Sequence, residues 1–189
     1  MMALVLFLWP SRSVKGALLD WPTARMLPWR ILLLFGGGFA LASGFKESGL
    51  SLWFGSQLEF VADYPIWFII AGIAFMMTFL TELTSNTATT EMILPVLAGI
   101  AIHTELNPLL LMIPATLSAS MAFMLPVATP PNAIVFGSGR ISMKQMAMNG
   151  LILNLLGVII VSLMMLFWGT IVFDIDLSVF PDWAIHTLD

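Results

Sequence analysis

The sequence lacks cysteine and carries few charged residues. Without a thiol, the chain has no disulfide framework, no cysteine metal site and no thiol chemistry. Charged residues make up only 10% of its 189 residues, whereas soluble domains carry roughly 25%. The net charge of -4 does not indicate a nucleic-acid-binding protein, which would favour a basic face, so no nucleic-acid partner is expected. What is abundant is apolar: 59% of the residues are hydrophobic.

Long apolar segments recur along the chain, and runs of about 18 residues or more are typical of membrane spans. We therefore expect an all-α membrane protein that lies in a lipid bilayer. The pattern predicts a span at 29–45, a polar surface segment at 46–64, a hairpin at 65–105, a broken helix at 107–139 and a final span at 150–173.

The first residues do not form a convincing signal peptide. Met1–Trp9 is apolar but has no leading positive charge, and Pro10 ends it without a small-residue cleavage site. We interpret residues 1–27 as the end of a preceding helix followed by a basic loop, which indicates that the chain is a fragment. Residues 174–189 form an acidic tail.

The distribution of basic residues predicts the orientation. Four lie within 11–30 (Arg12, Lys15, Arg25 and Arg30), and two follow the broken helix. The positive-inside rule places such clusters in the cytoplasm. We expect 11–30 and 140–148 inside and 46–64 and 174–189 outside, in a multi-pass protein of the inner, or plasma, membrane.

The predicted hairpin is apolar at both ends and polar between them. Residues 81–90 read Thr-Glu-Leu-Thr-Ser-Asn-Thr-Ala-Thr-Thr. Each apolar arm is short for a crossing, which takes about 20 helical residues. The segment therefore predicts a re-entrant hairpin with a polar tip, although two tilted spans joined by a turn remain an alternative.

A second polar interruption divides the segment 107–139. Ala128-Thr129-Pro130-Pro131-Asn132 ends the helix there, because proline has no amide proton and clashes with the preceding turn. Interrupted helices are typical of transporter binding sites, since half-helix N-termini attract anions and unwound carbonyls suit Na⁺. The alternative, hydrogen bonds between helices at kinks, is common for single polar residues in membranes.

Two motifs resemble those of a known family, the divalent anion:sodium symporters, which include sodium/dicarboxylate and sodium:sulfate symporters. Ser85-Asn86-Thr87 resembles the family's Ser-Asn-Thr motif. The stretch Ala119–Val135, with Phe123 and Pro126-Val127-Ala128-Thr129-Pro130-Pro131-Asn132 inside it, resembles its long signature. The resemblance extends from about Pro28 to Trp168.

The resemblance implies that residues 28–173 are the second repeat, one half of an inverted-repeat ion transporter. Each repeat of the family has a re-entrant hairpin and a broken helix, and the transport domain moves by an elevator-type motion against a dimeric scaffold. This chain has one Ser-Asn-Thr motif and one Pro-Pro-Asn break. We therefore expect a missing N-terminal repeat and a homodimer when the protein is complete.

The resemblance also implies sodium-coupled symport of small divalent anions, chiefly C4-dicarboxylates such as succinate, with Na⁺ as the coupling ion and no organic cofactor. Substrate would be bound by Ser85, Asn86, Thr87, Thr129 and Pro130. Sodium would be bound by Thr81, Thr84, Asn86 and Ala128, mainly through carbonyls and the Asn86 side chain.

Other interpretations remain open. One is a related transporter of citrate, sulfate or arsenite, and another is a remnant that transports nothing. An intramembrane hydrolase is disfavoured, because Ser85 has no histidine nearby in the sequence and no hydrolase motif is present. We expect no enzyme activity.

A few further residues invite an interpretation. Glu91 is an ionisable group at membrane depth and so a functional candidate, unless it only bonds within the hairpin. Glu82 is expected to orient the tip, and Gly36–Gly38 to form a packing notch or a local unwinding of the helix. For Asn154 and Ser162 we expect hydrogen bonds between helices.

Overall fold

The computed structural model describes residues 2–11, 16–26, 29–57, 63–177 and 179–185. Arg12, Lys15 and Asp189 lie outside these residues. The described part is mostly helical and contains no strand, only one isolated bridge between Pro10 and Ala17. The all-α class is confirmed for this part of the chain.

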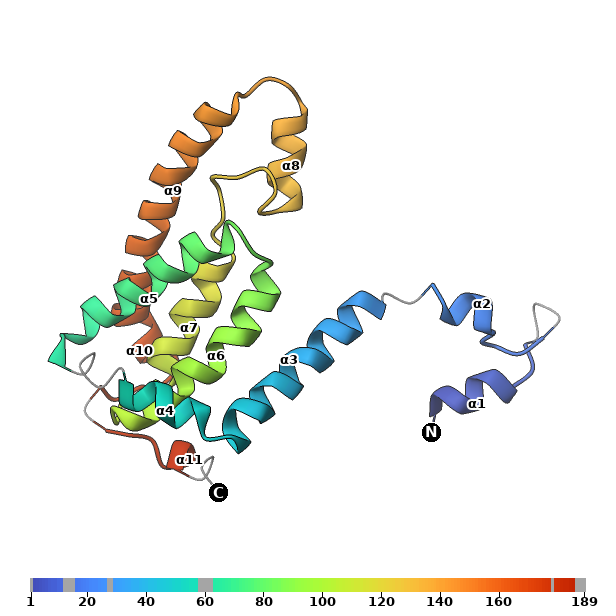
Figure 1. Ribbon diagram of the computed structural model, residues 1–189, viewed down its shortest axis with the longest axis horizontal. Coiled ribbons are helices and arrows are strands. Elements are labelled where there is room, and N and C mark those ends of the chain that lie inside the picture. Colours follow the sequence, from blue (N-terminus) through green and yellow to red (C-terminus); the bar gives the residue numbers. More distant parts are fainter. Residues whose placement is uncertain (1, 12–15, 27–28, 58–62, 178, 186–189) are drawn as a thin grey trace. The chain divides into compact units, whose positions relative to one another are not determined.

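The helices follow one another along the chain, with α5 to α8 near its middle (Figure 1). They are α1 (Met2–Leu8), α2 (Trp21–Ala24), α3 (Trp29–Glu47), α4 (Leu50–Gln57), α5 (Ile66–Thr81), α6 (Asn86–His103), α7 (Leu109–Ala119), α8 (Pro130–Gly137), α9 (Met143–Met164), the π-helical turn η2 (Met165–Gly169), α10 (Thr170–Val172) and α11 (Asp182–Ile185).

The chain divides into two compact units, residues 1–37 and 38–189. In the first unit, Asp20 caps α2 by accepting a hydrogen bond from the Thr23 amide at 2.9 Å. Hydrogen bonds from the Thr23 side chain and amide lower the pKa of Asp20, because they favour its charged form.

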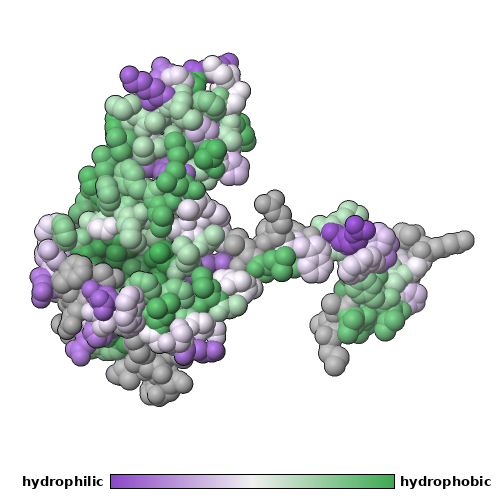
Figure 2. All heavy atoms as spheres, in the orientation of Figure 1, coloured by the Kyte–Doolittle hydropathy of each residue, from purple (hydrophilic) through white to green (hydrophobic). Residues whose placement is uncertain are grey.

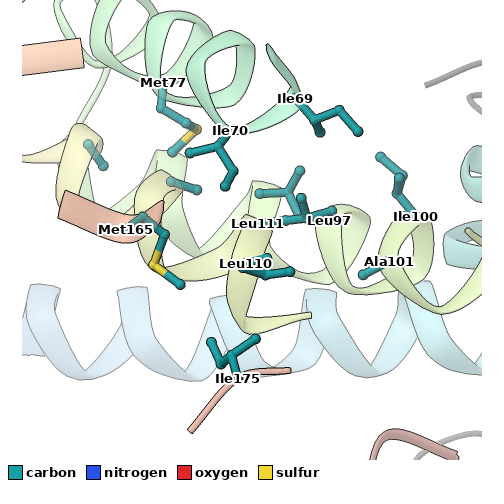
Figure 3. Close-up of a cluster of buried hydrophobic side chains, with 12 residues drawn as sticks. Ile69, Ile70, Met77, Leu97, Ile100, Ala101, Leu110, Leu111, Met165 and Ile175 are labelled. Carbon is teal, nitrogen blue, oxygen red and sulfur yellow. The ribbon is translucent and has the colours of Figure 1, made fainter. Parts of the chain in front are cut away.

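In the second unit, α5, α6 and α7 form the core. The helix α7 packs against both α5 and α6, while α9 packs against α5 and α7. Ile70 and Met77 of α5 meet Leu110 and Leu111 of α7, and Leu97 of α6 completes the contact (Figure 3). This apolar core holds α5, α6 and α7 together.

The predicted interruptions coincide with helix ends. The polar segment 81–90 contains the end of α5 and the start of α6. The segment 128–132 contains the start of α8, and ten residues separate α7 from α8, 120–129. Serine, threonine and asparagine compete with the helix backbone for hydrogen bonds, and proline removes one, so both interruptions have a local cause.

The last helical stretch, Met143–Val172, is the one described segment that is long and apolar enough to cross a membrane. Its outer face carries apolar side chains such as Ile152, Ile160 and Phe167, which are exposed. Figure 2 shows apolar residues along this unit and hydrophilic ones at the end where α8 connects to α9. The helices α5 and α7 are apolar but shorter.

This stretch begins at Met143 rather than at Gly150, where the hydropathy pattern predicted the span. Ser142 and Gln145 form a capping box, in which each side chain bonds the other residue's backbone amide. The stretch is also not regular throughout, because η2 interrupts it between α9 and α10.

The expected glycine notch is confined to one residue. A Cβ added at Gly38 would lie 2.0 Å from Glu91 Oε2, whereas at Gly36 and Gly37 no atom lies within 4 Å. Gly38 therefore allows the Glu91 side chain of α6 to lie against α3.

Candidate functional site

Threonine hydroxyls close the connection between α5 and α6. Thr84 Oγ1 donates to the Leu80 carbonyl at 2.8 Å and also hydrogen-bonds to Thr89 Oγ1. Thr90 Oγ1 donates to the Asn86 carbonyl at 2.8 Å. The same Leu80 carbonyl, in the last turn of α5, also accepts from the Leu83 amide at 3.2 Å. The tip is therefore an ordered turn.

Thr81 joins this tip to the end of α7. Its hydroxyl oxygen lies within hydrogen-bonding distance of Asn86 Oδ1 and of the Ala119 carbonyl, the latter at 2.8 Å, and its one proton is shared between these two acceptors. Thr81 is buried and Asn86 is half-buried. Hydroxyl, amide and carbonyl oxygens thus meet at one point, and neutral oxygen donors are the ligands that hard cations prefer.

The N-terminus of α6 is exposed and uncapped by its own N-cap residue. Ser85 precedes the helix, yet its side chain makes no capping hydrogen bond. Ser85 and Thr87 are both exposed. Because the first amides of a helix have no intrahelical acceptor, the first turn of α6 offers N–H groups to an anion.

The N-terminus of α8 differs from that of α6. Pro130 and Pro131 are its first two residues and have no N–H group. The next amide, that of Asn132, donates to Thr129 Oγ1 at 3.4 Å. At this break the Thr129 hydroxyl is therefore the donor available to a ligand, not the backbone.

Side chains also hold the connection between α7 and α8, where Ala128 and Thr129 lie. Asn132 Nδ2 donates to the carbonyls of Ala122 at 2.8 Å and Leu125 at 3.0 Å. Glu82 accepts hydrogen bonds from the amides of Met124 and Leu125. Non-helical backbone at membrane depth needs such partners.

The predicted site residues therefore cluster on two connections that touch each other. The tip carries Thr81, Thr84, Ser85, Asn86 and Thr87, and it is bonded to Ala119, Met124 and Leu125. Ala128, Thr129 and Pro130 follow Leu125 on the second connection. Among the described residues, no direct hydrogen bond joins these last three to the tip.

The structure adds three residues whose contacts the sequence did not specify: Glu82, Asn132 and Asn154. Glu82 and Asn132 belong to the two polar interruptions, and Asn154 is a polar residue within an apolar helix, which is the signal that the sequence offers. Asn154 bonds to other elements, as expected, through Glu82 and the Phe123 amide. For Ser162 the expectation was wrong, because its hydroxyl donates to Val158 of its own helix.

Glu91 stands apart from this network. Its Oε1 is buried and has no hydrogen-bond partner, so this oxygen does not bond within the hairpin. Within the described residues, no three His, Asp or Glu side chains gather as a metal site. A cation at the tip would therefore be held by neutral oxygens.

Comparison with known proteins gives the same picture. The family model described as the sodium:sulfate symporter transmembrane region matches residues 1–175. The sodium-dependent dicarboxylate transporter SdcS of Staphylococcus saprophyticus is 47% identical over 93% of this chain and 34% of its own length. The human Na(+)/dicarboxylate cotransporter 3 is 49% identical over 88% of this chain and 28% of its own length.

The chain thus spans about a third of the length of the curated relatives it matches. The resemblance seen in the Ser-Asn-Thr motif and the long signature is confirmed, and so is a membrane location. The chain belongs to the sodium:sulfate symporter family.

Proposed function

We propose that this chain forms one side of a site for sodium-coupled symport of small dicarboxylates such as succinate, in a multi-pass transporter of the plasma membrane. The observation that carries the proposal is the tip between α5 and α6. There, oxygens of Thr81 and Asn86 lie together beside an uncapped helix N-terminus. The tip could therefore bind a cation and an anion at adjacent positions.

The anion would be bound at the first turn of α6. Its amides and the side chains of Ser85, Asn86 and Thr87 would donate to one carboxylate, helped by the positive end of the helix dipole. The hydroxyl of Thr129 would donate from the other connection, and the Pro130 ring would line the pocket. All these groups are neutral, so the pocket holds no permanent cation that would trap the substrate.

Sodium would be bound at the base of the same tip. The carbonyls of Thr81, Thr84 and Ala128 and the Asn86 side-chain oxygen would be its ligands. A sodium ion a few ångströms from a carboxylate attracts it strongly where water is scarce, by about 4 kcal/mol at an effective dielectric of 20. This attraction couples the binding of the two ions.

The other side of the site would come from a second, inverted repeat, with α5 and α6 as a re-entrant hairpin. Two large apolar side chains on the connections support this: Leu83 is 78% exposed and Val127 is 83% exposed. A dianion in a low-dielectric site also needs partners on more than one side. We propose that the second repeat covers this surface, in an assembly that is a homodimer.

Sulfate is a second candidate substrate, because the matching family is described by its sodium:sulfate symporters. An uncapped helix N-terminus binds either anion. Competition separates the two: we expect unlabelled succinate to displace labelled succinate at lower concentration than sulfate does. The reverse order would favour sulfate.

The direct test is Asn86→Ala in membranes that hold this chain together with the N-terminal part of the staphylococcal relative. Losing one hydrogen bond to a charged group lowers affinity about tenfold to a hundredfold. We expect the half-saturating concentrations of both sodium and succinate to rise by that factor. Asn149→Ala, an exposed asparagine of α9, is the matched control. Unchanged sodium dependence in Asn86→Ala would contradict the assignment.

A further inference from the structure

Glu82 makes more long-range hydrogen bonds than any predicted ligand of the tip. It is the C-cap residue that directly follows α5, and it is 4% exposed. Its Oε1 accepts from the Met124 amide at 2.8 Å and from Asn154 Nδ2 at 2.8 Å, and its Oε2 accepts from the Leu125 amide at 2.9 Å. A carboxylate suits these positions, because it only accepts hydrogen bonds.

Asn154 completes the arrangement from α9. Its side chain is fully buried, and its Oδ1 accepts from the Phe123 amide at 3.2 Å. Three consecutive backbone amides, 123 to 125, are therefore bound by two side chains that also bond to each other. This is the stretch where the backbone has left the helix and needs partners most.

The same stretch lies directly on α9. A Cβ added at Gly150 would fall 2.3 Å from the Phe123 carbonyl oxygen and 2.5 Å from Met124 Cα. Only a glycine lets the two backbones approach so closely. The connection 123–125 is thus held between Glu82 on one side and α9 on the other.

These contacts lie between the two halves of the proposed sodium site. Glu82 directly follows Thr81, whereas Leu125 shortly precedes Ala128. Most lone pairs of the Glu82 carboxylate are engaged by N–H groups, so they are not directed at an ion. The carboxylate instead fixes the distance between the tip and the second connection.

On the basis of the proposed function, we propose that Glu82 and Asn154 form a latch that holds the α5–α6 tip, the 123–125 connection and α9 as one unit. In this latch Glu82 is a positioning residue for sodium, not a sodium ligand. The latch keeps the Ala128 carbonyl in register with Asn86. Sodium affinity then depends on both latch residues together.

The test is a double-mutant cycle on this chain purified together with the N-terminal part of the staphylococcal relative. The thermal unfolding midpoint is measured against sodium concentration, with choline as the replacement cation. The variants are Glu82→Gln, which turns one acceptor into a donor that faces an N–H group, Asn154→Ala, and both together. Glu105→Gln, an exposed glutamate, is the matched control.

We expect sodium to raise the wild-type midpoint. In each single latch variant, the sodium concentration that gives half of the midpoint shift should rise by about tenfold or more. This is the factor expected for the loss of one hydrogen bond to a charged group. The double variant should need no more sodium than the single variant that binds sodium less tightly. The reason is that residues of one network do not act additively. Glu105→Gln should match the wild type.

Three results would overturn the proposal while leaving the sodium site intact. The first is a Glu82→Gln chain with the sodium dependence of the wild type. The second is a normal sodium dependence in Asn154→Ala, which decides the matter alone if Glu82→Gln does not fold. The third is a double variant whose loss is the product of the single losses, as for an independent ligand. If the wild-type pair of parts is insensitive to sodium, the proposed function is refuted, and the latch's role with it.

Discussion

At the scale of single residues, Thr81 stabilises the tip between α5 and α6. Its hydroxyl is the group that joins Asn86 to the end of α7. Thr81→Val keeps the shape but leaves the Ala119 carbonyl without that bond, which should cost about 1–3 kcal/mol. We expect a lower free energy of unfolding in detergent and weaker sodium binding.

Thr116→Val is the matched control for this substitution. Thr116 is exposed, and its hydroxyl donates only to Met112 of its own helix. Its loss should change the free energy of unfolding by less than about 0.5 kcal/mol. If the two variants are equally stable, the Thr81 hydroxyl does not support the tip.

The roles of individual residues were predictable only in part. Ser85, Asn86 and Thr87 are singled out by a contiguous motif, which can be read directly in the sequence. The partners of Glu82 are 42 and 72 residues away at Met124 and Asn154. No local pattern specifies such a pairing, because it depends on how the helices pack.

At the scale of helices and connections, the backbone of 123–124 lies close to α9 at Gly150. Gly150→Ala would force backbone of 123–124 away from α9, since the added Cβ meets main-chain atoms at 2.3–2.5 Å. Such overpacking costs about 1–3 kcal/mol or more. We expect a lower unfolding midpoint and loss of sodium stabilisation.

Gly72→Ala provides the control for Gly150→Ala. Gly72 lies inside α5, and an added Cβ there meets no atom within 4 Å. Alanine is favoured over glycine in a helix by about 1 kcal/mol, so this variant should be as stable as the wild type or more so. Equal destabilisation by both substitutions would show that the 123–124 backbone does not lie against α9.

Helix ends were predictable where their cause is local. The C-terminus of α5 and the N-termini of α6 and α8 follow from the serine, threonine, asparagine and proline residues in the two interruptions. The start of α9 at Met143 was missed, because Lys144 and Gln145 lower the hydropathy there although Ser142 and Gln145 form a capping box. The connection 120–129 was also not predictable in detail, since Glu82, Asn132 and Asn154 determine it from a distance.

At the scale of the whole molecule, the proposed topology predicts which residues face opposite sides of the membrane. Met143–Val172 has 30 residues, and a helix of that length measures about 45 Å, enough to cross a hydrocarbon core of about 30 Å. The chain has no cysteine, so single cysteines report cleanly. A cysteine at Lys144 should react with an impermeant maleimide only from the cytoplasmic side, and one at Asp182 only from outside. Labelling of both from one side would contradict the topology.

We propose that this chain supplies one side of a sodium-coupled dicarboxylate site. The most direct measurement is the uptake of labelled succinate into vesicles that hold this chain together with the N-terminal part of the staphylococcal relative, with each part alone for comparison. We expect uptake driven by a sodium gradient only when both parts are present, because only then is a dianion enclosed on two sides. Equal uptake by this chain alone, or no gain from combining two inserted and associated parts, would contradict the account.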